Sequence, residues 1–231
     1  MIRYSPLTHS PAAAMALTFA LASAATAPAQ TPAAATPSAS VKSDAGVASD
    51  AISAKPLAVG AKAPEAVLAD ADGKPVKMSA LLAEGPALVI FTRGGWCPYC
   101  TTQLGKLATI EGDLKAAGYR IVALTHDAPE FLKADAAKAK IGYMLLSDAA
   151  GEAARAFGVA FRVDDGTRSK YLEKYKLDLD KRAGGRTDHV LPMPAAFVID
   201  KAGVIRYAYS NPDYAVRVDA AVLLNAARAA R

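Results

Sequence analysis

The sequence contains only two cysteines, Cys97 and Cys100, so any thiol chemistry in the chain must take place at this pair. A zinc site would need two further ligands, and His126 and His189 lie far apart with no second Cys or His pair nearby. A structural disulfide that closes so short a loop would contribute only about 2 kcal/mol. A redox-active pair is therefore the leading interpretation, ahead of a structural disulfide and of a zinc site.

No apolar run reaches the roughly 20 residues that a membrane-spanning helix needs. The run 12–25 follows Arg3 and leads to small residues at Ala27 and Ala29, a pattern typical of a secretory signal peptide. We expect residues 1–29 to be a cleavable signal peptide, so that the protein is exported, reaches the periplasm and keeps no stable membrane anchor. A disordered alanine-rich tail is the alternative.

Large apolar residues are also scarce in residues 30–55, which consist mainly of Ala, Pro, Ser and Thr. Such a segment buries too little surface to offset its ordering entropy, so we expect a disordered linker. Residues 56–231 then form one domain of ordinary size. The net charge of +5 is modest and both signs are interspersed, which does not favour a nucleic-acid partner.

The pattern of apolar residues in residues 56–231 predicts an α/β domain. A hairpin over 65–78 precedes a buried strand over 87–92, a helix from 98 to about 117 and a strand over 119–125, which together form a right-handed βαβ unit. Asp127 is expected to cap the next helix, which ends near Ala139. Further elements are predicted at 141–146, 148–157 and 169–175, followed by a hairpin over 197–209 and a helix over 214–229.

The two cysteines lie at the turn between the buried strand and the following helix. If Cys97 is the N-cap, Pro98 takes the first helical position, where its missing N–H is not needed. Free backbone amides and the helix dipole would then lower the pKa of the Cys97 thiol. We expect Cys97 to be the nucleophile and Cys100, one turn further on, to be the resolving thiol.

These residues converge on a family. Phe91-x-Arg93-Gly94-Gly95-x-Cys97-Pro98-Tyr99-Cys100, followed by Pro194-x-x-Phe197-Val198-Ile199-Asp200-x-x-Gly203, resembles the thioredoxin-like superfamily. More closely, it resembles the peroxiredoxin-like branch of the alkyl hydroperoxide reductase and thiol-specific antioxidant family. This resemblance implies a thioredoxin-like fold with a mixed central sheet flanked by helices, an N-terminal β-hairpin and a helical insertion before a cis-proline. Pro194 would be that cis-proline and would face the cysteines.

The sequence departs from the peroxiredoxin pattern at two positions. The family is expected to carry a Thr or Ser three residues before the peroxidatic cysteine, where this chain has Gly94. Arg93 could supply a cation that stabilises the Cys97 thiolate, or it could be a solvated loop charge. Pro194 stands where an arginine is often found, which favours disulfide exchange.

The leading functional hypothesis is a thiol-dependent peroxidase in which Cys97 attacks a hydroperoxide and Cys100 resolves the product as a disulfide. A thioredoxin-like dithiol protein would reduce it, and no cofactor or metal is expected. The first alternative is a thiol-disulfide oxidoreductase that acts on protein disulfides, and the second is a noncatalytic binding module. The expected supporting residues around the cysteine pair are Arg93, Trp96, Pro98, Tyr99 and Pro194.

Overall fold

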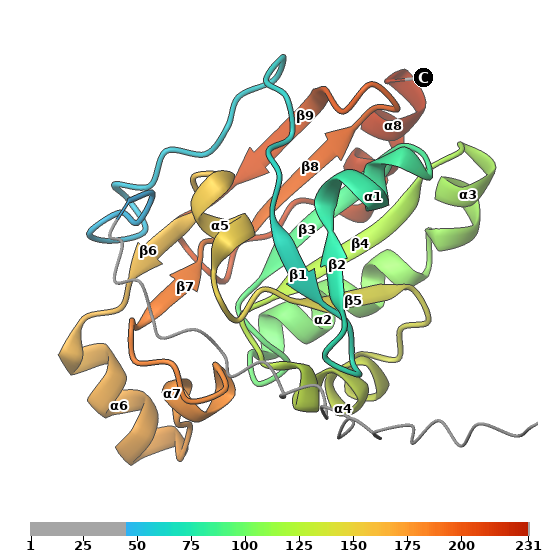
Figure 1. The fold of residues 1–231 in the computed structure, drawn as a ribbon. Helices are drawn as coiled ribbons and strands as arrows, with labels where there is room; N and C mark the ends of the chain where they lie inside the picture. Colours follow the sequence, from blue (N-terminus) through green and yellow to red (C-terminus); the bar gives the residue numbers. More distant parts are fainter. Residues whose placement is uncertain (1–44, 231) are drawn as a thin grey trace, which may run out of the picture. The chain divides into compact units, whose positions relative to one another are not determined.

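The computed structural model describes residues 45–230. The predicted signal peptide and residues 30–44 of the predicted linker therefore lie outside the described residues. The core is a seven-stranded mixed sheet with the strand order β2-β1-β5-β4-β3-β8-β9 (Figure 1). Its strands are β1 (Val67–Ala69), β2 (Pro75–Lys77), β3 (Ala87–Thr92), β4 (Arg120–Thr125), β5 (Met144–Ser147), β8 (Ala195–Ile199) and β9 (Ile205–Ser210).

The central strand β3 is buried along its whole length, as its uninterrupted apolar sequence predicts. It pairs in parallel with β4 and antiparallel with β8, so the sheet is mixed as expected. The predicted N-terminal hairpin is also confirmed, because β1 and β2 pair antiparallel at one edge of the sheet. A separate two-stranded sheet joins β6 (Ala160–Arg162) to β7 (Val190–Pro192).

Each face of the sheet has its own hydrophobic core, because β3 sends alternate side chains to opposite faces. Val89 and Phe91 pack with Phe157 and Phe197 on the face covered by α1 (Met78–Ala83) and α5 (Glu152–Ala156). Leu88 and Ile90 belong to the other core. That face is covered by α2 (Pro98–Ala108), α3 (Glu111–Ala116), α4 (Pro129–Ala139) and α8 (Ala220–Ala229).

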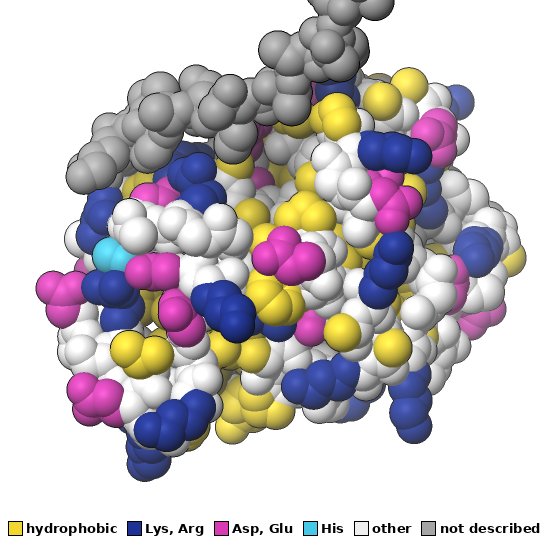
Figure 2. Space-filling model, turned by 60° about the horizontal axis from the view of Figure 1, so that its bottom comes forward, with side chains coloured by type: hydrophobic (Ala, Val, Ile, Leu, Met, Phe, Trp, Pro, Cys, Tyr) yellow, Lys and Arg dark blue, Asp and Glu magenta, His cyan; other side chains and the backbone are white. Residues whose placement is uncertain are grey.

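The predicted helical insertion consists of α6 (Asp165–Tyr175) and α7 (Leu179–Arg182), which follow β6 and precede β7 in the chain and lie beyond the ends of these two strands (Figure 1). Asp164 and Asp178 cap these helices by accepting hydrogen bonds from Thr167 N and Lys181 N. Figure 2 shows basic and acidic side chains interspersed over one face of the molecule, without a large area of one sign. Among the described residues, no helix is both long and apolar enough to cross a membrane.

Three predicted boundaries are wrong. Residues 45–55, assigned to the linker, lie against the domain, where Ala48 exchanges backbone hydrogen bonds with Ala160 and Arg162. The helix expected to reach residue 117 ends at Ala108, where the Thr109 hydroxyl donates to the carbonyl of Lys106 and α3 starts afresh. The last helix begins at Ala220 rather than 214, because the Asp219 side chain caps it.

The prediction for Pro194 is wrong in its peptide geometry, since no cis peptide bond occurs among residues 45–230. The trans form is the favoured one by about 0.5–1 kcal/mol, and here nothing requires a reversal of the chain. The segment passes in an extended form from β7 to β8. Met193 N donates to the Val159 carbonyl at 2.7 Å, and Asn211 N donates to the Pro194 carbonyl at 3.2 Å.

Candidate active site

The loop between β3 and α2 carries both cysteines, and Cys97 is the N-cap of α2 with Pro98 in the first helical position, as predicted. The Cys97 sulfur makes no side-chain capping hydrogen bond, although the backbone amide of Cys100 acts to lower the pKa of Cys97, as expected. Both thiols are free in the structure. Both side chains are buried, with Cys97 2% exposed and Cys100 0% exposed.

The prediction that the pKa of Cys97 is lowered is wrong, because the lowered pKa belongs to Cys100. The pKa of Cys100 is lowered well below its usual value by the hydrogen bond that the Cys97 thiol donates to it and by the Arg217 guanidinium. The pKa of Cys97 is raised by that same hydrogen bond and by burial, although Arg93 acts in the opposite direction. When the pair loses one proton, the negative charge is therefore favoured on Cys100 rather than on Cys97.

Arg93 lies at the end of β3 with its guanidinium enclosed by aromatic rings. It is 4% exposed, and its Cζ lies 4.3 Å from the centroid of the Tyr214 ring, 5.0 Å from that of Trp96 and 5.6 Å from that of Tyr171. It donates to the Tyr171 hydroxyl, and its Nε is buried without a hydrogen-bond partner. The alternative of a solvated loop charge is therefore excluded, because this cation is buried beside Cys97.

The Gly94-Gly95 dipeptide lets the loop approach two buried carboxylates. Gly95 N donates to Asp127 Oδ2 at 2.7 Å. A Cβ on Gly95 would fall 2.1 Å from Asp135 Cγ, and one on Gly94 would fall 2.6 Å from Asp127 Oδ2. Only residues without a side chain fit at these two positions, which explains the repeated glycine in the motif.

Asp127 does not cap α4, contrary to prediction, and the N-cap is Ala128. Its carboxylate instead accepts two hydrogen bonds from Arg182, one of them from Nε at 2.7 Å, and the same guanidinium contacts Asp135 Oδ2 at 2.5 Å. Burial raises the pKa of Asp127 to about 7 despite this partner. The insertion thus supplies the cation that holds the loop in place through Asp127 and Asp135.

A cavity of about 450 Å³ opens beside Cys97. Arg93, Trp96, Pro98 and Tyr99 line it as well, so the structure brings together most of the predicted site. The residues that the insertion and the C-terminal segment add to its wall are Tyr171, Tyr175, Lys176, Leu177 and Tyr214. Pro194 lines a separate cavity of about 240 Å³ together with Arg93, and neither cysteine lines that cavity.

Sequence reasoning missed the residues that come from distant parts of the chain. Arg217 and Tyr214 belong to a stretch predicted as helix, and Tyr171 and Arg182 belong to the insertion, to which no role could be assigned. His126, considered as a zinc ligand, is buried, and burial lowers its pKa to about 4. Among residues 45–230, no group of three or more His, Cys, Asp or Glu side chains is placed to hold a metal ion.

The family model described as the AhpC/TSA family matches residues 59–208, more than half of the chain. The chain belongs to the AhpC/TSA family. Among similar proteins, a chloroplastic peroxiredoxin Q of Sedum lineare is 29% identical over 152 residues, covering 66% of this chain and 68% of the relative. Peroxiredoxin Bcp of Escherichia coli strain K12 is 34% identical over 104 residues, covering 45% of this chain and 66% of the relative.

Solved structures of peroxiredoxins have a similar fold. Peroxidoxin BcpB from Mycobacterium tuberculosis has a TM-score of 0.56 at 24% identity and covers 75% of this chain and 97% of its own. Reduced Prx3 from Vibrio vulnificus in complex with H₂O₂ has a TM-score of 0.59 at 18% identity, and the match covers 74% of this chain and 99% of the Prx3 chain. The predicted AhpC/TSA membership and thioredoxin-like fold are therefore confirmed. The matched relatives also favour a thiol-dependent peroxidase over a noncatalytic module.

Proposed function

We propose that this AhpC/TSA protein is a thiol-dependent peroxidase in which Cys97 reduces a hydroperoxide. The observation that carries the proposal is the position of Cys97, which lines a cavity that also contains the buried Arg93 guanidinium. Cys100 is fully buried, so a substrate that enters this cavity meets Cys97 first. The position of Cys97 in the cavity supports it as the nucleophile, even though the surrounding groups favour the negative charge on Cys100.

The chemistry begins with a proton transfer across the hydrogen bond between the thiols, from Cys97 to Cys100. The Cys97 thiolate attacks the terminal oxygen of the hydroperoxide, an S–O bond forms and the O–O bond breaks. The leaving alkoxide or hydroxide is protonated to an alcohol or water, and Cys100 releases the proton that it accepted and is a thiolate again. Arg93 faces this developing negative charge, so its guanidinium takes the stabilising part that a hydroxyl three residues before the cysteine would otherwise share.

A second step forms the disulfide. The Cys100 thiolate attacks the sulfur of the Cys97 sulfenic acid, an S–S bond forms, the S–O bond breaks, and the hydroxide that leaves is protonated to water. The two electrons lost by the thiol pair must come back from a dithiol reductant, for which a thioredoxin-like protein has the required chemistry. We also propose that residues 1–29 direct export to the periplasm, and N-terminal sequencing of cell-fractionated protein would test this.

The test uses the fluorescence of Trp96, the only tryptophan of the chain. Trp96 lines the cavity, so its fluorescence reports on the oxidation of the cysteine pair. Reduced protein mixed with hydroperoxide should oxidise far faster than a free thiolate of equal pKa, because Arg93 stabilises the transition state. Arg93→Met should remove most of that acceleration. The matched control Arg206→Met, which removes a cation paired with Asp200, should not.

A Cys100→Ser variant completes the test. After oxidation it should accumulate a sulfenate on Cys97 that a dimedone reagent traps. If peroxide instead reacts only at the free-thiolate rate while this variant captures proteins as mixed disulfides, the peroxidase proposal fails. Exchange with protein disulfides would then be the activity.

A further inference from the structure

A short irregular segment, residues 211–219, crosses the first turn of α2 and reaches Cys100; we name it the strap. Its backbone is held by side chains of its own, since Asn211 Oδ1 accepts from Asp213 N at 2.9 Å and Asp213 Oδ1 accepts from Ala215 N at 2.9 Å. Tyr214 packs its ring against Arg93 and Tyr99. The strap is therefore a built part of the site.

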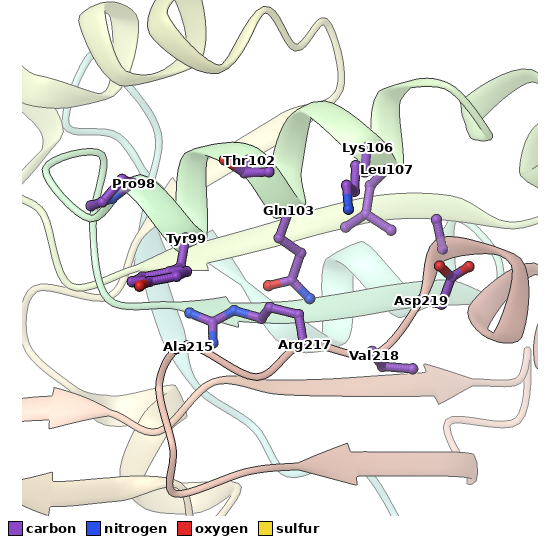
Figure 3. Close-up of a pocket in the computed structure, with 11 residues that line it drawn as sticks. Pro98, Tyr99, Thr102, Gln103, Lys106, Leu107, Ala215, Arg217, Val218 and Asp219 are labelled. Carbon is purple, nitrogen blue, oxygen red and sulfur yellow. The ribbon is translucent and has the colours of Figure 1, made fainter.

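Arg217 is the residue of the strap that approaches Cys100. Its Nη2 lies 3.4 Å from Cys100 Sγ, while Nη1 donates to the carbonyls of Tyr214 and Val216. Figure 3 shows the guanidinium extended beneath α2, near Tyr99 and Gln103. The two carbonyls hold the planar group in place, so its orientation toward the sulfur is fixed by the fold.

The charge of Arg217 is not neutralised by a carboxylate. Within the described part of the chain it forms no ion pair, and its Nε is buried without a hydrogen-bond partner. The nearest acidic residue along the chain, Asp219, uses its carboxylate to cap α8 at Ala221 N. A guanidinium without a counter-ion, pointed at a fully buried sulfur, is suited to a sulfur that carries the negative charge.

Other groups around Cys100 also lower the pKa of its thiol. The Cys97 thiol, the Thr92 hydroxyl and the Arg93 backbone amide each favour the thiolate of Cys100 over its neutral form. Burial alone would oppose it, because Cys100 is 0% exposed. Arg217 supplies the only full positive charge in hydrogen-bond contact with this sulfur among residues 45–230.

We propose that Arg217 is a catalytic residue that keeps Cys100 as a thiolate and so accelerates both the formation and the opening of the Cys97–Cys100 disulfide. The proposal rests on the proposed peroxidase function for the first of these steps only. It assigns to Cys100 three successive tasks, as the acceptor of the Cys97 proton, as the nucleophile that resolves the sulfenate and as the leaving group on reduction.

The reductive step shows why the cation matters. A thiolate of the dithiol reductant attacks the Cys97 sulfur, a new S–S bond forms and the Cys97–Cys100 bond breaks. Its electron pair stays on Cys100, whose sulfur is received by the guanidinium of Arg217. The second thiol of the reductant then releases Cys97, and the reductant leaves as a disulfide. A leaving thiol of lower pKa departs faster, so Arg217 accelerates this reduction.

The first test measures the ionisation of Cys100 alone, in a Cys97→Ser background, from the ultraviolet absorbance of the thiolate against pH. Adding Arg217→Met should raise the midpoint by about 1 unit or more, the effect expected of an opposite charge in direct contact. Lys106→Met is the matched control, because Lys106 and Arg217 line the same cavity of about 490 Å³ beneath α2 and Lys106 makes no hydrogen bond to the sulfur. It should shift the midpoint by less than about 0.3 units, since the Lys106 side chain is exposed and its charge is screened by water and salt.

The second test keeps both cysteines and follows the equilibrium with dithiothreitol. Arg217→Met should shift that equilibrium about tenfold toward the protein disulfide, the counterpart of one pKa unit on the leaving thiol. Arg217→Gln, which keeps a donor for the strap carbonyls, replaces the Met variant if that variant does not fold. An unchanged midpoint and equilibrium, or equal shifts in Lys106→Met, would overturn the proposal. Neither test uses peroxide, so failure of the peroxidase function would appear separately as a slow peroxide reaction of the unmodified protein.

Discussion

Replacing Gly95 by alanine adds one methyl group to the active-site loop, and the structure predicts a large loss of stability. The new Cβ would lie 2.1 Å from both Cγ and Oδ1 of Asp135, where carbon contacts normally begin at about 3.5 Å. The Asp135 side chain would have to move by more than about 1 Å, away from the Arg182 guanidinium that it contacts at 2.5 Å.

The magnitude follows from the burial of this network. Removing one partner of a buried ion pair costs about 3–5 kcal/mol, and Arg182 keeps Asp127, so the lower figure applies. We expect Gly95→Ala to lose about 3 kcal/mol of unfolding free energy. With a urea dependence of about 2 kcal/mol per molar, the midpoint of urea unfolding should fall by about 1.5 M.

The same substitution at Gly112 is the control. Gly112 lies in α3, and a Cβ there meets nothing within 4 Å. Alanine is favoured over glycine in a helix by about 0.5–1 kcal/mol, so Gly112→Ala should raise the midpoint slightly. The reasoning is refuted if the two variants unfold at the same urea concentration, or if Gly95→Ala is the more stable.

Three further predictions follow from the site and its supports. Arg182→Met should cost about 3–5 kcal/mol in urea unfolding because two buried carboxylates lose their cation, whereas Arg168→Met, in a more exposed pair, should cost under about 1 kcal/mol; equal losses would contradict this. Tyr175→Ala removes part of the cavity wall and should slow oxidation by an aryl hydroperoxide more than oxidation by hydrogen peroxide, as followed by Trp96 fluorescence; equal slowing would count against the cavity as the substrate site. Burial raises the pKa of Asp148 to about 7, above its unfolded value, so its contribution to stability is present at low pH and is lost as pH rises from about 4 to about 7. Asp148→Asn should flatten the dependence of urea unfolding on pH in that window, and an unchanged slope would refute the assignment.

The arrangement of charge explains how a CxxC pair in this setting can serve a peroxidase. Of the two cysteines, Cys97 alone lines the cavity, whereas the groups that favour a thiolate lie around Cys100. The hydrogen bond between the two thiols lets a proton pass from Cys97 to Cys100. The negative charge can therefore rest on Cys100 and move to Cys97 when a substrate enters the cavity. Arg93, beside the cavity, stabilises the leaving oxygen of the hydroperoxide, and Arg217, beneath α2, stabilises the Cys100 thiolate.

The sequence by itself determined the elements whose signals are local. The apolar run 87–92 predicts a buried strand, and Pro98 after Cys97 marks the first turn of a helix, so the position of the cysteine pair could be predicted. The hairpins followed from alternation and turn residues. The family followed from the order of two motifs about a hundred residues apart, and all of these were confirmed.

Tertiary structure decided which groups face the sulfurs. Arg217 reaches Cys100 across a separation of 117 residues, and Arg182 reaches Asp127 across 55, and no local pattern marks either contact. Asp127 carries the sequence signature of a helix cap, yet a buried guanidinium and the Gly95 amide compete for its carboxylate and win. The distribution of the proton between Cys97 and Cys100 likewise depends on charges brought in by the strap. A pKa responds to every charge within a few ångströms in space, and the sequence gives only distance along the chain.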